Sequence, residues 1–262
     1  MKNVSTVEIL GRRLEYRWIG PRPGEAPSIV FLHEGLGSVG MWRDFPDRLA
    51  AATGCGALVY GRTGHGGSGK VSGPRPVRYM HDEALDVLPA VFRHFELETA
   101  VLFGHSDGAS IALIHAGAHA GSVRALVVEA PHVFVETVSI EGIERITADY
   151  ATTNLKERLA RHHGTNTDSM FRAWSEVWLR PEFREWNIEK YLPAIDCPVL
   201  VVQGEDDQYG TLEQVEAVVN QVGGTAESLI IPGCGHAPHA ERPDEVLGAA
   251  AGFIKKALDT RR

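Results

Sequence analysis

A serine, an aspartate and a histidine lie in three short glycine-containing segments that are far apart in this 262-residue chain. Ser106 is at the centre of Gly-His-Ser-Asp-Gly, Asp207 ends Gly-Glu-Asp-Asp, and His236 directly follows a glycine. A serine hydroxyl is a weak nucleophile at neutral pH and needs a base, and a carboxylate is needed to fix the tautomer of that base. These residues therefore predict a nucleophile, Ser106, with His236 as its base and Asp207 as the acid.

The nucleophile needs a particular local structure. Glycines two residues before and after Ser106 let a strand and a helix approach closely, so that the serine hydroxyl is exposed on a tight turn. Residues 99–103 are a short apolar run typical of a buried strand, and residues 109–116 favour a helix. Ser106 could instead only cap that helix. The strand-turn-helix setting favours the nucleophile.

Apolar runs alternate with helical segments along most of the chain. We expect an edge hairpin at residues 6–10 and 13–19, followed by strands at 28–33, 55–60, 99–103, 123–128, 197–203 and 226–231. Helices are expected over residues 42–52, 80–95, 212–222 and 243–258, with a kink in the second at Pro89. This alternation predicts a doubly wound, mostly parallel α/β sheet covered by helices on both faces.

One long segment, 133–192, interrupts the alternation. It is helical in tendency, most clearly over 147–159 and 169–179. We interpret the segment as a helical insertion into a core domain formed by residues 1–132 and 193–262.

An aromatic stripe lies in the predicted insertion. Phe171, Trp174 and Trp178 are spaced so that they share one face of a helix. Such a stripe is either core packing or a wall of a substrate pocket. The sequence leaves both interpretations open, and Trp174 and Trp178 are the candidates for the pocket.

The chain resembles an α/β-hydrolase from the first hairpin to the last helix. The resemblance rests on Gly-x-Ser-x-Gly around Ser106, Gly-x-x-Asp ending at Asp207, Gly-His at His236, and the Glu-x-Pro that begins at Glu241. It implies a helical cap at 133–192. Haloalkane dehalogenases and epoxide hydrolases resemble this fold but have an aspartate in place of the serine, so the resemblance favours a serine hydrolase.

The resemblance also implies an oxyanion hole made of two backbone amides. One is the amide of Asp107, and the other comes from the loop that begins at His33. The family usually has His-Gly there, so Glu34 is a departure, and Gly35 is preferred over Glu34 as the second donor. The Glu34 side chain then either caps the neighbouring turn or positions substrate or water. The Asp107 carboxylate is favourable at a helix N-terminus without any catalytic duty.

Three carboxylates are candidates for the acid that orients His236. Asp206 and Asp207 are adjacent, so in a turn their side chains point in different directions and only one can reach the imidazole. Glu129 is a rival, because some α/β-hydrolases place the acid after the strand at 123–128 and a buried carboxylate there needs a partner. The Gly-x-x-Asp spacing favours Asp207.

Charge and cysteine content argue against several other classes of protein. The formal net charge of −8 and the lack of a Lys/Arg cluster argue against binding to nucleic acid or to an anionic membrane. The sequence has no apolar signal segment, and its three cysteines match no zinc pattern. His236 and His239 are three apart, but no third metal ligand is evident. We expect a cytoplasmic protein without a metal or a cofactor.

The function expected from these residues is hydrolysis of a small to medium, largely apolar carboxylic ester through an acyl-enzyme. Lactone hydrolysis, C–C bond hydrolysis and cofactor-free perhydrolysis can use the same triad and stay open. A non-catalytic ligand-binding protein with this fold is the alternative from another class, since fold does not imply function. An intact Ser, Asp and His set argues against it.

Overall fold

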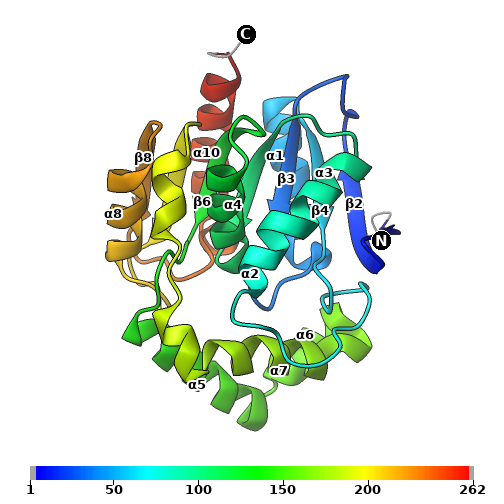
Figure 1. The fold of residues 1–262 in the computed structure, drawn as a ribbon, viewed down its shortest axis with the longest axis vertical. Helices are drawn as coiled ribbons and strands as arrows, with labels where there is room; N and C mark the ends of the chain where they lie inside the picture. Colours follow the sequence, from blue (N-terminus) through cyan, green and yellow to red (C-terminus); the bar gives the residue numbers. More distant parts are fainter. Residues whose placement is uncertain (1–3, 260–262) are drawn as a thin grey trace.

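The computed structural model describes residues 4–259, which form an eight-stranded sheet covered by helices on both faces (Figure 1). The strand order is β1-β2-β4-β3-β5-β6-β7-β8. The first hairpin pairs antiparallel, as do β2 and β4, and every pairing from β4 through β3 to β8 is parallel. The strands are β1 (Ser5–Ile9), β2 (Arg12–Ile19), β3 (Ser28–Leu32), β4 (Gly56–Tyr60), β5 (Ala100–His105), β6 (Val123–Glu129), β7 (Val199–Gly204) and β8 (Ala226–Ile231). The predicted mostly parallel α/β sheet is confirmed.

Helices cover the two faces of the sheet in two groups (Figure 1). One face carries α1 (Phe45–Thr53) and α10 (Pro243–Asp259). The other face carries α2 (Tyr79–Asp82), the π-helical turn η2 (Glu83–Val87), α3 (Leu88–His94), α4 (Asp107–Ala118) and α8 (Leu212–Gln221). Two short elements, the 3₁₀ helix η1 (Val39–Trp42) and helix α9 (Pro238–Glu241), lie in loops that follow strands β3 and β8.

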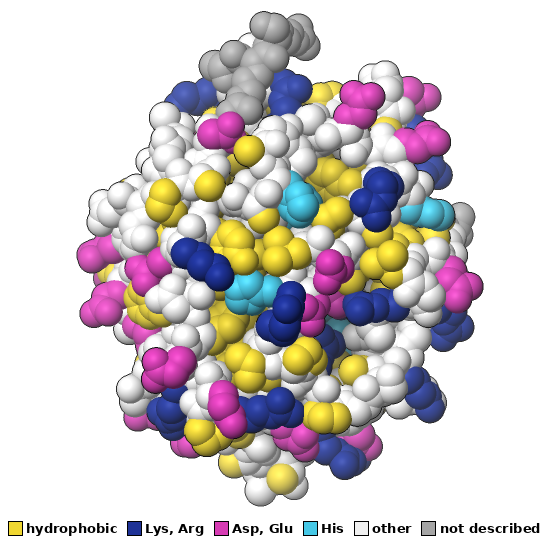
Figure 2. Space-filling view, viewed as in Figure 1, with side chains coloured by type: hydrophobic (Ala, Val, Ile, Leu, Met, Phe, Trp, Pro, Cys, Tyr) yellow, Lys and Arg dark blue, Asp and Glu magenta, His cyan; other side chains and the backbone are white. Residues whose placement is uncertain are grey.

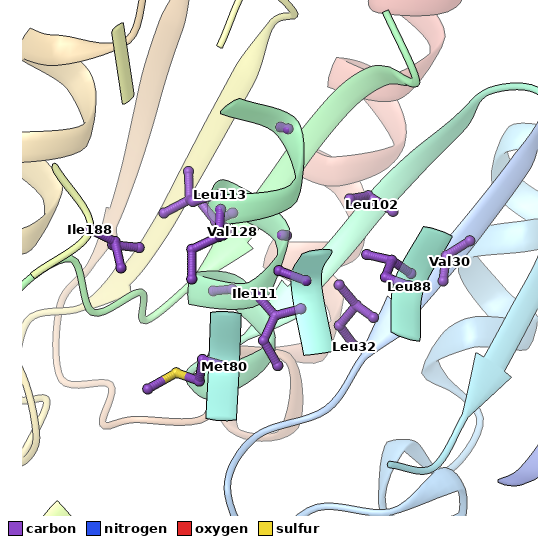
Figure 3. Packing of buried hydrophobic residues seen from close by; sticks show 14 of the residues in the cluster. Val30, Leu32, Met80, Leu88, Leu102, Ile111, Leu113, Val128 and Ile188 are labelled. Carbon is purple, nitrogen blue, oxygen red and sulfur yellow. The ribbon is translucent and has the colours of Figure 1, made fainter. Parts of the chain in front are cut away.

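Alternate residues of the central strands enter two hydrophobic clusters, one on each face. On β5, Leu102 belongs to the cluster that contains Leu88 and Leu113 (Figure 3). Phe103, the next residue, belongs to the cluster that contains Phe45 of α1. Because helices cover both faces, β3, β4 and β5 are buried along their whole length, as continuous apolar runs predict.

The segment 133–192 is helical and lies beyond one end of the sheet (Figure 1). The helical tendency predicted over 147–159 is divided between two helices: one helix ends at Thr152 and the next begins at Leu155, because the backbone is extended at Thr153. The elements of this region are α5 (Thr137–Thr152), α6 (Leu155–His163), η3 (Gly164–Asn166), α7 (Thr167–Trp178), η4 (Pro181–Glu185) and η5 (Glu189–Ala194).

The helix predicted over 80–95 is present from Tyr79 to His94, and it contains a π-helical turn, η2, directly before α3. Pro89 is in the first turn of α3, directly after η2. Proline has no N–H to donate and is therefore best tolerated in the first turn of a helix. The helix accommodates Pro89 by a local change of its hydrogen-bond pattern, the π-helical turn that directly precedes α3.

The turn between β5 and α4 brings three segments into close contact. Ser106 has φ 53° and ψ −117°, a conformation that is rare for a residue with a side chain. A Cβ atom on Gly108 would lie 1.9 Å from the carbonyl oxygen of Leu32, and one on Gly104 would lie 2.4 Å from the carbonyl oxygen of Gly108. Glycine is therefore required at both positions, and the two glycines hold Ser106 on the turn.

This packing predicts opposite effects for two Gly→Ala substitutions. Gly108→Ala should lower the free energy of unfolding by about 1–3 kcal/mol or more, because the new methyl group meets backbone that cannot move aside. Gly252→Ala on the exposed side of α10, where an added Cβ has no neighbour within 4 Å, should raise it by up to about 1 kcal/mol through helix propensity. Urea denaturation of both variants measures this. Equal stabilities of the two variants would contradict the account.

Candidate active site

Ser106, His236 and Asp207 form a chain of hydrogen bonds at the carboxyl edge of the sheet. Ser106 Oγ lies 3.0 Å from His236 Nε2. His236 Nδ1 lies 2.8 and 2.9 Å from the two carboxylate oxygens of Asp207. The three residues follow β5, β8 and β7, so the sheet brings together groups that are 130 residues apart in sequence. With Nδ1 donating to the carboxylate, Nε2 is free to accept the serine proton.

Two further donors hold the Asp207 carboxylate. The backbone amide of Tyr209 donates to one oxygen at 2.8 Å, and Gln203 Nε2 donates to the other at 2.7 Å. Only 1% of the Asp207 side chain is exposed. Burial raises the pKa of this carboxyl, but the charge and hydrogen bond of His236 and the Tyr209 amide outweigh burial and hold the pKa below its ordinary value. Asp207 is therefore ionised at neutral pH.

The other two candidate acids lie elsewhere. Asp206 is exposed. Glu129 is fully buried and accepts from His239 twice, from the ring Nδ1 and from the backbone amide, both at 2.5 Å. The buried carboxylate at the end of β6 thus has its partner in His239, and not in His236.

Glu34 pairs with a histidine directly before the serine. Its Oε2 lies 3.6 Å from His105 Nδ1, and His105 Nε2 donates to the backbone carbonyl of His236 at 2.7 Å. Burial lowers the pKa of His105, but Glu34 and Glu129 outweigh burial and raise it above the ordinary value. The Glu34 carboxylate therefore favours the protonated form of an imidazole that also holds the backbone of His236.

The Glu34–His105 and Glu129–His239 pairs lie next to each other. Ligand atoms of His105, Glu129 and His239 all lie within 4.8 Å of one another, and all three residues are buried. His236 and His239 are three residues apart in the sequence, a spacing that two metal ligands could have. In the structure they point to different partners, because His236 faces Ser106 and His239 faces Glu129. Glu34 can form an ion pair with His105, and Glu129 can form one with His239, so that the charges of these four residues balance.

Arg62 connects the two segments that carry the predicted oxyanion amides. Its guanidinium donates to the carbonyl oxygens of His33 and Glu34 at 2.6 and 3.0 Å, and to the Asp107 carboxylate at 3.3 Å. The Tyr79 hydroxyl also donates to Asp107, at 2.7 Å. The Asp107 side chain is therefore occupied in a buried network. As the first residue of α4, Asp107 has an amide without an acceptor inside the helix.

A cavity of about 240 Å³ opens beside Ser106. Gly35 and Asp107 line it, together with the catalytic candidates Ser106 and His236. Most of its remaining wall is apolar and comes from the helices of segment 133–192, including Ile143, Ile146 and Leu159. On the face shown in Figure 2, side chains of both charges are interspersed.

The aromatic stripe contributes both to the wall of the cavity and to the packing between helices. Trp174 and Trp178 line the cavity. Phe171 stacks on Tyr150, with ring centroids 3.7 Å apart, and packs between helices. The Trp178 indole N–H donates to the Tyr79 hydroxyl at 3.0 Å, which links the pocket wall to the network around Asp107.

Fold and site together define a hydrolase of the α/β type, and residues 29–249 match the model of the Alpha/beta hydrolase family. The chain belongs to this family. A proline iminopeptidase from Lactobacillus helveticus is 24% identical, over 91% of this chain and 92% of that one.

Solved structures show the same fold. A carboxylesterase structure from Nitrososphaera gargenis superimposes with a TM-score of 0.78 at 18% identity, covering 98% of this chain and all of that one (100%). An enol-lactonase from Burkholderia xenovorans superimposes with a TM-score of 0.70 at 21% identity, covering 95% and 99%. Within residues 4–259, no helix is long and apolar enough to cross a membrane.

The Glu129–His239 pair predicts a pH-dependent stability. Burial lowers the pKa of His239, but Glu129 outweighs burial and raises it. A raised folded-state pKa stabilises the fold below the unfolded pKa of about 6.5, and the effect is lost as pH rises through the folded pKa. The stability advantage of wild type over Glu129→Gln should therefore be largest below about pH 6.5 and shrink as the pH rises above it.

Urea denaturation across this pH range measures that difference. The control is Asp206→Asn, which changes an exposed carboxylate in the same part of the molecule. Its free energy of unfolding should change with pH in the same way as that of wild type. A wild-type advantage over Glu129→Gln that is constant with pH would show that the raised pKa of His239 does not contribute.

Proposed function

We propose that this chain is a serine hydrolase acting on a small to medium, largely apolar carboxylic ester. The observation that carries the proposal is the hydrogen-bond chain from Ser106 Oγ through His236 to the buried carboxylate of Asp207. The chain lies at an apolar cavity of about 240 Å³. A cavity of this size and character suits a substrate with a short aliphatic or aryl acyl group.

The proposed reaction has two halves. Ser106 Oγ attacks the ester carbonyl while His236 Nε2 takes its proton, and the amides of Asp107 and Gly35 stabilise the oxyanion. The imidazolium then gives its proton to the departing alcohol, which leaves an acyl-enzyme. Water attacks the acyl-enzyme with His236 again as base, and the acid leaves as Ser106 regains its proton. No step requires a metal or an organic cofactor.

Residues 133–192 are proposed as a cap on the core formed by residues 1–132 and 193–262. This segment supplies most of the apolar wall of the cavity, including Trp174 and Trp178. A water-excluding wall strengthens the hydrogen bonds that stabilise the oxyanion. The cap would therefore contribute to both substrate selection and rate.

Lactone hydrolysis is the second candidate, because a lactone is a cyclic ester and can be attacked by the same groups. C–C bond hydrolysis and cofactor-free perhydrolysis also remain compatible with the triad. A non-catalytic binding protein is disfavoured, since such a protein has no need for a serine bonded to a histidine that is oriented by a buried carboxylate.

A substrate panel tests the proposal. It contains nitrophenyl esters of rising acyl length, aryl esters, lactones and a vinylogous diketone, each assayed with wild type and Ser106→Ala. We expect ester hydrolysis that depends on Ser106, with a graded preference for short apolar acyl groups, because each methylene contributes only about 1–3 kcal/mol. Ester hydrolysis that survives in Ser106→Ala would contradict the assignment of the nucleophile.

The assignment of the acid has its own test. Asp207→Asn should lower kcat by about 10⁴-fold, because His236 would be held in the wrong tautomer. Asp206→Asn and Glu129→Gln should retain most of the activity, since neither carboxylate contacts His236. The three variants are assayed on one ester at one pH. Collapse of activity in Glu129→Gln, with Asp207→Asn nearly intact, would place the acid at the end of β6 instead.

A further prediction concerns Glu34. Glu34→Gln should retain kcat to within about tenfold, because Gly35 and not Glu34 is the proposed second oxyanion donor, and a glutamine amide oxygen can still face His105. The measurement is kcat and KM on the best ester of the panel. A loss of about 10²–10³-fold, the size expected for a missing oxyanion donor, would show that the Glu34 carboxylate is needed directly.

A further inference from the structure

His132 lies in the loop that follows β6, and its side chain lines the cavity beside Ser106. The Ser110 hydroxyl fixes its backbone by donating to the His132 carbonyl at 2.6 Å and accepting from the His132 amide at 3.3 Å. The His132 ring packs edge-on against Trp178, and its centre lies 5.9 Å from the ring centre of His236. Because His236 contacts Ser106 Oγ, His132 is held close to the place where the carbonyl of an ester would react.

The two ring nitrogens of His132 differ in their access to the cavity. Neither nitrogen has a hydrogen-bond partner within residues 4–259. Nδ1 is fully buried, whereas Nε2 is not, so Nε2 belongs to the 2% of the residue that is exposed. The side chain borders the cavity, and Nε2 can therefore be reached from it. The Trp174 N–H also has no partner there, but it is fully buried against Gly35, where no ligand can reach it.

The His132 ring is neutral at physiological pH. Burial, and next the positive charge that His236 can carry, lower the pKa of His132 to about 3. A neutral imidazole has one N–H and one lone pair, so Nε2 is a donor in one tautomer and an acceptor in the other. A hydroxyl group can both donate and accept, and it therefore matches either tautomer. A ring without charge also offers no ion pair to a carboxylate.

We propose that His132 Nε2 binds a hydroxyl group of the substrate close to the scissile carbonyl. The inference rests on the proposed function and narrows its substrate class to esters that carry a hydroxyl group on the acyl or the alcohol part. A polar atom in an apolar wall is unfavourable while it has no partner, and a substrate hydroxyl removes that cost. An ester with a methyl group in place of the hydroxyl leaves Nε2 unpaired and is therefore selected against.

Two matched pairs of esters provide the test, one for each part of the substrate. The acyl pair is the 4-nitrophenyl esters of 3-hydroxybutanoic and 3-methylbutanoic acid, and the alcohol pair is the 2-hydroxypropyl and 2-methylpropyl esters of butanoic acid. Within each pair a hydroxyl replaces a methyl group, and both enantiomers of each hydroxy ester are used. We measure kcat/KM of all esters with wild type and with His132→Phe, which keeps an aromatic ring without the nitrogens.

His132→Phe should act selectively on the pair whose hydroxyl reaches Nε2. In that pair it should lower kcat/KM for the hydroxy ester about three- to tenfold more than for the methyl ester, the effect of losing one hydrogen bond. Differences in intrinsic reactivity between the two esters cancel in this comparison. A variant that folds poorly loses activity on both esters alike and does not imitate the effect.

Two further variants identify the nitrogen. A glutamine side chain can place its amide where Nε2 lies, whereas an asparagine side chain reaches only the position of Nδ1. His132→Gln should therefore keep the preference for the hydroxy ester, and His132→Asn should lose it as His132→Phe does. A selective loss in His132→Phe that His132→Gln does not reverse would show that the shape of the ring selects the substrate, and would overturn the proposal.

The outcomes also separate this inference from the proposed function. Equal changes within both pairs in His132→Phe, with wild type active through Ser106, would overturn the His132 assignment and leave the serine hydrolase intact. Wild type that hydrolyses none of these esters, nor any ester or lactone of the panel, would overturn the proposed function and the His132 assignment with it.

Discussion

The backbone turn at Ser106 is the constraint on which the rest of the site depends. A residue with a side chain held at φ 53° is strained by about 1–3 kcal/mol and persists only where the surrounding packing fixes it. Here the packing is the contact of Gly108 with the carbonyl of Leu32, which presses the start of α4 against the end of β3. The same contact brings the loop after β3 next to the serine. One backbone contact therefore positions both the candidate nucleophile and the loop that carries Gly35.

Two acid-histidine pairs hold the loops around this turn. The Glu34–His105 pair binds the backbone of His236, and Glu129 binds the amide two residues before the end of α9, at His239. Removing one partner from such a pair leaves an uncompensated buried charge, which costs more than the pair contributes. These groups contact no reacting atom in the proposed mechanism. They fix the loops whose side chains contact the reacting atoms. A loss of activity in a variant of one of these pairs therefore has to be separated from a loss of structure.

The sheet and the three central site residues could be predicted because each depends on a local pattern. Continuous apolar runs predict strands that are buried on both faces, and the glycines around Ser106 are required by contacts within a few residues of chain or with the adjacent strand. The partners of His105, His239 and Arg62 could not be predicted, since they are brought together by the sheet from distant segments. The break at Thr153 was not predicted either, because no glycine or proline marks it in the sequence.

The central claim is that Ser106 is an activated nucleophile, and covalent labelling tests it most directly. The purified protein is incubated with a fluorophosphonate, and the modified peptide is mapped by mass spectrometry. The account predicts one added phosphonyl group on Ser106 in the native protein, lost on denaturation before labelling and absent from Ser106→Ala. A native protein that stays unlabelled, or a label that maps to the neighbouring Ser110 in place of Ser106, would contradict the account.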